Sequence, residues 1–282
     1  MKRAIGMLAG GLALLAVLSG CGAFSRPAET RVTLTVAVYQ LRSDYAVRQA
    51  QIEVTNHSSV DVQVTSASFT SSWFASTVSS PSAPNQLLAK STTDFKVVLA
   101  AARCDVARAT PSVTIRFTRP DKSTGTVTTT PTIPFDSIAL VHAQDCAQHE
   151  FEKVATISIA PAVRFEQVAG KPIALLDVTF TPTGAAGSVT LHSTEDTTLL
   201  AQREGSLRTI GLTLTAASGP TTVTLDYVPA GCLQHRVAED KIGTLIPMRV
   251  DAGPYRNTLF SMPVPAAVKA QLLDWVGVYC GW

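Results

Sequence analysis

The sequence predicts an all-β fold built from two β-sandwich domains in tandem, and three observations support this prediction. Apolar and polar residues alternate with a period of two in many short segments, as expected of strands that bury one face. Clusters of Gly, Pro and Ser separate these segments, which is typical of antiparallel sandwiches. Four of the five cysteines also fall into two pairs of similar spacing, one pair in each half of the chain.

The first 20 residues have the layout of a secretory signal peptide. A basic start at residues 1–3 precedes an apolar run over residues 4–18. The run ends in Leu18-Ser19-Gly20-Cys21, where two small residues precede a thiol. This motif resembles the lipobox of bacterial lipoproteins, which implies cleavage before Cys21 and lipidation of its sulfur. An ordinary signal peptide with a chance cysteine is the alternative.

Residues 21–30 are predicted to be a short tether, so the first domain is expected close to the bilayer. Two or three acyl chains on Cys21 would give stable attachment. The predicted location is therefore the extracytoplasmic face of the cell membrane. Arg outnumbers Lys and Asn is scarce, a usage similar to that of high-GC Gram-positive bacteria. The whole layout resembles two-domain lipoproteins of those bacteria, a resemblance that implies no activity.

The charge balance argues against nucleic-acid binding. The whole chain has 23 Lys and Arg against 21 Asp and Glu, and loss of Lys2 and Arg3 with the signal peptide makes the two counts equal. Nucleic-acid binding needs an excess of cations that displaces counterions from phosphates. The expected partners are therefore the membrane, through the lipid anchor, and an envelope protein or glycan.

The first domain is expected over residues 31–147. Alternating segments lie at residues 32–38, 50–54, 60–64 and 113–117. A turn at residues 56–59 predicts a hairpin between the second and third of these segments. A further turn is expected at residues 119–125, and a short helix starting at Pro134 is expected before Cys146.

The second domain, residues 148–282, repeats the plan of the first. The segments 157–159, 174–180, 223–227 and 246–250 correspond to strands of the first half. A second helix is expected after Pro265, where Val268, Leu272 and Trp275 form an apolar stripe. Residues 147–153 are interpreted as a short joint between the domains.

The four cysteines after the anchor are expected to form two structural disulfides. Four cysteines allow three pairings, and the repeat favours Cys104–Cys146 and Cys232–Cys280 because only that pattern recurs in each half. A metal or redox role is the alternative, although no pair has Cys-x-x-Cys spacing. In a metal site, Cys146 would be flanked by His142 and His149.

No motif for catalysis or for a cofactor is present. The sequence has no Gly-x-Ser-x-Gly, no metalloprotease His-Glu-x-x-His and no phosphate-binding loop. We therefore expect no cofactor, no metal and no catalytic residue. Carboxylates that meet only in the fold would be the exception, and the candidates are Asp44, Glu166 and Asp226.

Three residues are candidate binding residues. Arg42 and Tyr45 belong to a polar cluster between two strands, for which a charged loop is the alternative interpretation. Trp282 ends a C-terminal group of aromatic residues that could instead fill the core beside Cys280. The predicted function is a non-catalytic binding or scaffolding role in the cell envelope by a pair of immunoglobulin-like modules. An exported enzyme acting on wall or carbohydrate polymers, or a carrier of small molecules or metal, is the alternative.

Overall fold

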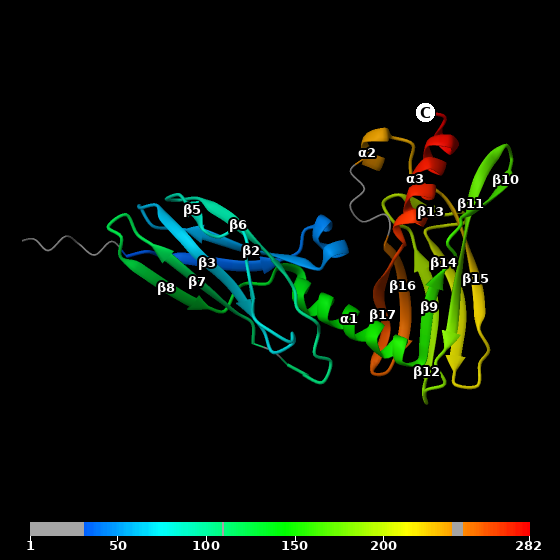
Figure 1. Ribbon diagram of the computed structural model, residues 1–282, viewed down its shortest axis with the longest axis horizontal. Helices are drawn as coiled ribbons and strands as arrows, with labels where there is room; N and C mark the ends of the chain where they lie inside the picture. Colours follow the sequence, from blue (N-terminus) through cyan, green and yellow to red (C-terminus); the bar gives the residue numbers. More distant parts are fainter. Residues whose placement is uncertain (1–30, 109, 239–244) are drawn as a thin grey trace, which may run out of the picture. The chain divides into compact units, whose positions relative to one another are not determined.

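The computed structural model describes residues 31–108, 110–238 and 245–282, nearly half of which lie in antiparallel β-strands (Figure 1). This part of the chain contains four sheets, and the expectation of a mainly β fold is confirmed. None of its helices combines the length and the apolar character needed to cross a membrane.

The first two sheets share one hydrophobic cluster. Their strand orders are β1-β2-β6 and β4-β3-β7-β8, with β5 paired to β3. Burial alternates along β3 and β7, so that Phe69, Ile115 and Phe117 enter the cluster while the residues between them face outward. The strands are β1 (Leu34–Tyr39), β2 (Gln49–Asn56), β3 (Val62–Thr70), β4 (Val78–Ser79), β5 (Asn85–Leu87), β6 (Thr92–Val98), β7 (Ser112–Thr118) and β8 (Thr124–Thr129).

The other two sheets share a second hydrophobic cluster. Their strand orders are β10-β11-β15-β13, with β9 paired to β11, and β14-β12-β16-β17. Phe180, Leu225 and Phe260 are among the fully buried side chains of this cluster. The strands are β9 (Ala155–Ile159), β10 (Arg164–Val168), β11 (Lys171–Pro182), β12 (Ser188–Glu195), β13 (Leu200–Gln202), β14 (Leu207–Thr215), β15 (Thr221–Pro229), β16 (Leu245–Ala252) and β17 (Tyr255–Pro263).

The order of strand pairing recurs in the two halves. The sequence β1-β2-β6 in the first half has its counterpart in β9-β11-β15, and β3-β7-β8 has its counterpart in β12-β16-β17. The strands of the two halves are therefore paired in the same order, as the matching apolar segments of the sequence suggest.

The predicted hairpin across residues 56–59 is wrong. Strand β2 pairs with β1 and β6, whereas β3 pairs with strands of the other sheet. Asn56 is buried at this crossing, and its side-chain amide donates to the carbonyl oxygens of Val60 (2.9 Å) and Leu88 (3.2 Å). These bonds satisfy the backbone where the chain leaves one sheet for the other. The turn expected at residues 119–125 does form, between β7 and β8.

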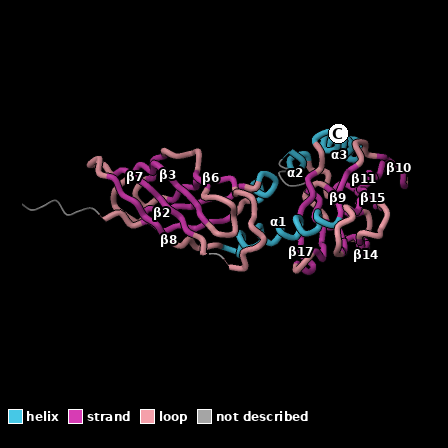
Figure 2. The backbone as a smooth tube through the Cα atoms, turned by 60° about the horizontal axis from the view of Figure 1, so that its bottom comes forward, coloured by secondary structure: helices cyan, strands magenta, loops and turns pink. Residues whose placement is uncertain are grey.

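The first helix is longer than the sequence predicted. After a 3-10 turn, η2 (Pro134–Asp136), helix α1 (Ser137–Val154) passes Cys146 and continues through the expected joint at residues 147–153 (Figure 2). The reason is the stripe Ala147, Phe151 and Val154, which is buried in the second cluster, while Ile138 and Val141 of the same helix are buried in the first. The predicted boundary between residues 147 and 148 thus falls inside a helix.

Both predicted disulfides are present. Cys104 bonds to Cys146 in α1, and Cys232 bonds to Cys280 at the end of helix α3 (Ala266–Cys280). A short helix, α2 (Gln234–Ala238), follows Cys232. Trp275 is buried on α3 as its stripe predicts, and its indole nitrogen donates to the carbonyl oxygen of Pro172.

Candidate functional site

A pocket of about 1290 Å³ lies over the start of α1. One wall is the 3-10 helix η1 (Arg42–Val47) with the residues that precede it, and another is η2 with the first turns of α1. The loop at residues 195–198 and parts of β16 and β17 complete the lining. The pocket is large enough to hold several side chains of a partner protein, or a small ligand.

Large apolar side chains are exposed around this pocket. Leu41 is 43% exposed, Tyr45 48%, Leu140 55% and Phe135 93%, and all four line the pocket. We call these four residues the apolar rim. Single exposed apolar residues are common on protein surfaces, but several of them around one pocket are typical of an interaction site.

Phe135 is held outward by an unfavourable backbone conformation. Its φ is 57° and its ψ 24°, which lies in the left-handed region, where an L-residue other than glycine costs about 1–2 kcal/mol. Thr132, just before it, is hydrogen-bonded to the backbone of β1, and Ile138, just after it, is fully buried. Both flanking positions are fixed in this way, so the fold maintains the strain at Phe135. Strained residues of this kind concentrate at functional sites.

The buried carboxylate of Asp44 holds the 3-10 helix η1 in place through hydrogen bonds. Asp44 is 2% exposed and accepts hydrogen bonds from the backbone nitrogen of Leu41 and the side-chain amide of Gln51, both at 2.8 Å. Asp44 is thus a buried member of the charged segment that connects β1 to β2. Because its carboxylate holds the turn, Arg42 and Tyr45 project from a defined backbone.

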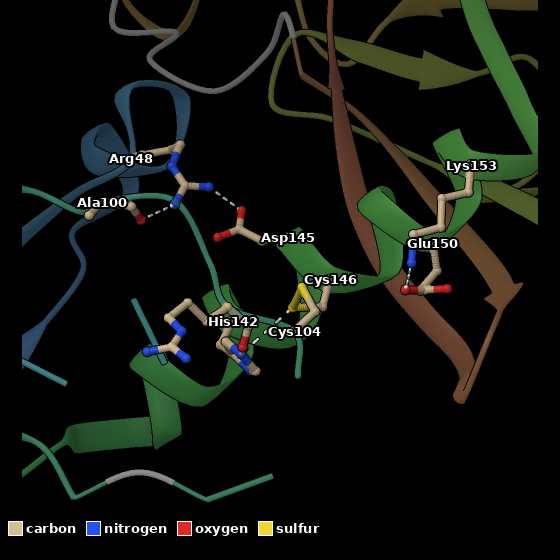
Figure 3. Close-up of a disulfide and its surroundings, with 9 residues drawn as sticks. Arg48, Ala100, Cys104, His142, Asp145, Cys146, Glu150 and Lys153 are labelled. Carbon is tan, nitrogen blue, oxygen red and sulfur yellow. Dashed lines mark hydrogen bonds and ion pairs between the residues drawn. A yellow bond between two sulfur atoms is a disulfide. The ribbon is translucent and has the colours of Figure 1, made fainter. Parts of the chain in front are cut away.

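An ion pair joins η1 to α1 at the edge of the pocket. The guanidinium of Arg48 contacts the Asp145 carboxylate and also donates to the carbonyl oxygen of Ala100 at 3.0 Å (Figure 3). Burial raises the pKa of the Asp145 carboxyl above its usual value, and Arg48 partly opposes that rise. The pair keeps the two walls of the pocket in place, since a half-buried carboxylate is costly without its cation.

The structure brings together two of the three candidate binding residues. Arg42 and Tyr45 both line the pocket, and Arg42 donates to the Thr198 hydroxyl at 3.3 Å. Trp282 does not line it; its indole nitrogen donates to the carbonyl oxygen of Cys232 at 3.2 Å, and its side chain is 48% exposed.

Phe135 and Leu140 are not predicted as site residues from the sequence, because both lie in the stretch expected to form a short helix. Leu140 lies away from the buried Ile138 and Val141 on the same helix. An apolar residue off the buried stripe of a helix is the signal that would have found it.

The candidate carboxylates have separate surroundings. Asp44 is bonded within η1, whereas Asp226 in β15 contacts the Arg208 guanidinium. Glu166 is exposed on β10. Cys146 is bonded to Cys104, and His142 is buried beside it, whereas His149 is exposed. Among the described residues no group of three or more His, Cys, Asp or Glu side chains is placed to hold a metal ion.

Comparisons with known proteins show no family for this chain. No family model matches the sequence, and no curated protein matches it. Solved structures give matches of low similarity. Red sea bream transglutaminase has a TM-score of 0.22 and 14% identity, with 83% of this chain and 31% of that chain covered.

Two further structures are similar at the same level. The chaperone–tip adhesion subunit complex CsuC–CsuE of Acinetobacter baumannii pili has a TM-score of 0.20 and 11% identity, over 80% of this chain and 97% of that one. The secreted serine protease VesC from Vibrio cholerae has a TM-score of 0.20 and 8% identity, over 71% and 46%. The chain thus spans about a third of the transglutaminase and about half of VesC, and these likenesses carry no argument about function.

Proposed function

We propose that this protein is a lipid-anchored envelope protein that binds a protein partner through the apolar rim, without catalysis. The observation that carries the proposal is the gathering of four exposed apolar side chains around one pocket, with Phe135 kept outward by the fold. Aromatic and arginine side chains dominate the energetics of protein interfaces. Phe135, Tyr45 and Arg42 supply both kinds at this site.

We further infer that the chain contains two tandem immunoglobulin-like β-sandwich domains, residues 31–147 and 148–282, with α1 running from one into the other. The repeated order of strand pairing supports this inference, as does one disulfide in each half between a loop and the helix of that half. Sandwiches present loops at their ends on a rigid support, which suits binding.

The anchor is supported by the motif that ends at Cys21, which lies outside the described residues. Replacing this residue (Cys21→Ser) should release the protein to the medium or leave it as an unprocessed precursor, because the acyl chains are attached to its sulfur. Detergent-phase partitioning and the intact mass of the mature protein measure this. Unchanged partitioning and mass in the variant would show that the protein is not a lipoprotein.

Truncating two side chains of the apolar rim to alanine should reduce the amount of the complex with the partner in intact cells. In the double variant Tyr45→Ala/Phe135→Ala, the affinity for the partner should fall about tenfold or more, since two central anchors are lost. Formaldehyde crosslinking of cells that express the chain, followed by mass spectrometry, measures the fraction of the protein found in protease-sensitive complexes. The melting temperature should change little because both side chains are exposed.

Leu233→Ala is the matched control, because Leu233 is 70% exposed and does not line the pocket. It should leave the crosslinked fraction at the wild-type value. An equal loss in the control and the rim variant would place the contact elsewhere. Crosslinked material that resists protease but is removed by glycosidases would indicate a glycan partner instead.

A further inference from the structure

The disulfide between Cys104 and Cys146 lies beside an imidazole. His142 is one turn before Cys146 on α1, and its Nε2 lies 3.6 Å from the Cys146 sulfur (Figure 3). The same nitrogen lies 3.0 Å from the carbonyl oxygen of Arg103. A carbonyl oxygen only accepts hydrogen bonds, so Nε2 carries a hydrogen whether or not the ring is charged. The sulfur therefore has an N–H group next to it in both protonation states of the ring.

The imidazole is held in this position by its other neighbours. The Trp73 ring stacks on it with a centroid separation of 4.8 Å and an interplanar angle of 13°, and Phe74 contacts it edge-on. Arg103 is itself fixed, because its backbone nitrogen donates to the carbonyl oxygen of Trp73 at 2.8 Å. Neither the ring nor the carbonyl can turn away without breaking these contacts.

The two sulfur-bearing residues differ in their exposure to solvent. Cys146 is fully buried, whereas Cys104 is half-buried in a turn. Cys104 is therefore the more accessible of the two residues to a thiolate from solution. The charge next to Cys146 is balanced as well, since the Asp145 carboxylate is paired with Arg48.

We propose that Cys104–Cys146 is a thiol-exchange site. An incoming thiolate attacks the Cys104 sulfur and forms a mixed disulfide with it. The bond between the two protein sulfurs breaks, and its electron pair leaves on Cys146, whose thiolate shares the Nε2–H of His142 with the carbonyl oxygen of Arg103. When the reagent is a dithiol, its second thiolate attacks the sulfur of the reagent and releases Cys104. The reagent is then oxidised to a disulfide and the protein is reduced by two electrons. This proposal does not depend on the apolar rim.

A stabilised leaving thiolate speeds exchange, so removal of the N–H group should slow it. The variant His142→Phe keeps a ring against Trp73 but has no N–H. Native full-length protein is treated with dithiothreitol, samples are quenched with acid and alkylated, and peptide mapping follows each disulfide separately. In the variant, reduction of Cys104–Cys146 should be slower by about threefold or more. Reduction of Cys232–Cys280 in the same molecules should keep its wild-type rate.

An unchanged or faster rate for Cys104–Cys146 in the variant would overturn the proposal. A faster rate is what a purely structural role for His142 would give, because loosened packing exposes the bond. A second measurement needs no variant: brief treatment of the wild-type protein with reduced glutathione, followed by acid quenching. The glutathione adduct should be on Cys104, and an adduct found mainly on Cys146 would contradict the proposed direction of attack.

Discussion

Replacing Phe151 with alanine is expected to destabilise the protein by about 3–5 kcal/mol. Phe151 is fully buried in α1, and its ring lies 6.2 Å from that of Phe180 and 5.7 Å from that of Phe260. Truncation would leave a cavity beside the rings of Phe180 and Phe260. Equilibrium unfolding in guanidinium chloride measures the change in free energy.

The matched control for this variant is on the same helix. Leu140→Ala removes a side chain that is 55% exposed, and the free energy of unfolding should change by no more than about 0.5 kcal/mol. If both variants lowered stability equally, burial of the second half of α1 against the strands of residues 155–263 would not explain the effect of Phe151→Ala.

Loss of the Cys104–Cys146 bond is expected to have an effect of similar size. The double variant Cys104→Ala/Cys146→Ala should lower the free energy of unfolding by about 2–5 kcal/mol, because the unfolded chain regains the freedom that the crosslink removes. The double variant Cys232→Ala/Cys280→Ala is the comparison. The bonds close loops of 42 and 48 residues, so their entropic contributions should differ by only about 0.1 kcal/mol.

Thermal and denaturant unfolding of the two double variants measures this pair of changes. A loss below about 1 kcal/mol for either bond would show that the chain-entropy account fails there and that the unfolded state is already restricted. A clear difference between the two changes in the free energy of unfolding would instead show that packing around the sulfur atoms contributes. Cys146 is fully buried, whereas Cys232 is exposed.

Local sequence patterns predicted the strands and the cysteine pairing well. The period-two alternation is visible wherever one face of a strand is buried, and the spacing of the cysteines recurs in both halves. The partner of each strand was harder to predict, as the wrong hairpin at residues 56–59 shows. Alternation says which face of a strand is buried, but it does not say which sheet the strand joins.

The full length of α1 and the exposure of Phe135 are not predicted from the sequence, for related reasons. Residues 147–153 contain several polar and charged side chains and few apolar ones. This composition predicts a joint between domains and not a buried helix. Phe151 is buried by the residues of the second hydrophobic cluster, most of which are distant from it in the sequence. Phe135 is a large apolar residue within the short helix that the sequence predicts. Its exposure follows from the fold, in which Thr132 is hydrogen-bonded to Val36 of β1 and Ile138 is buried.

The most direct test of the account is photo-crosslinking from the rim itself. A photoreactive amino acid is placed at Leu140, and separately at Leu233, in the full-length chain, and intact cells are irradiated. The account predicts a discrete crosslinked protein from position 140 and none, or a different and weaker set, from position 233. The same products from both positions, or products from position 233 alone, would contradict the assignment of the apolar rim as the binding site.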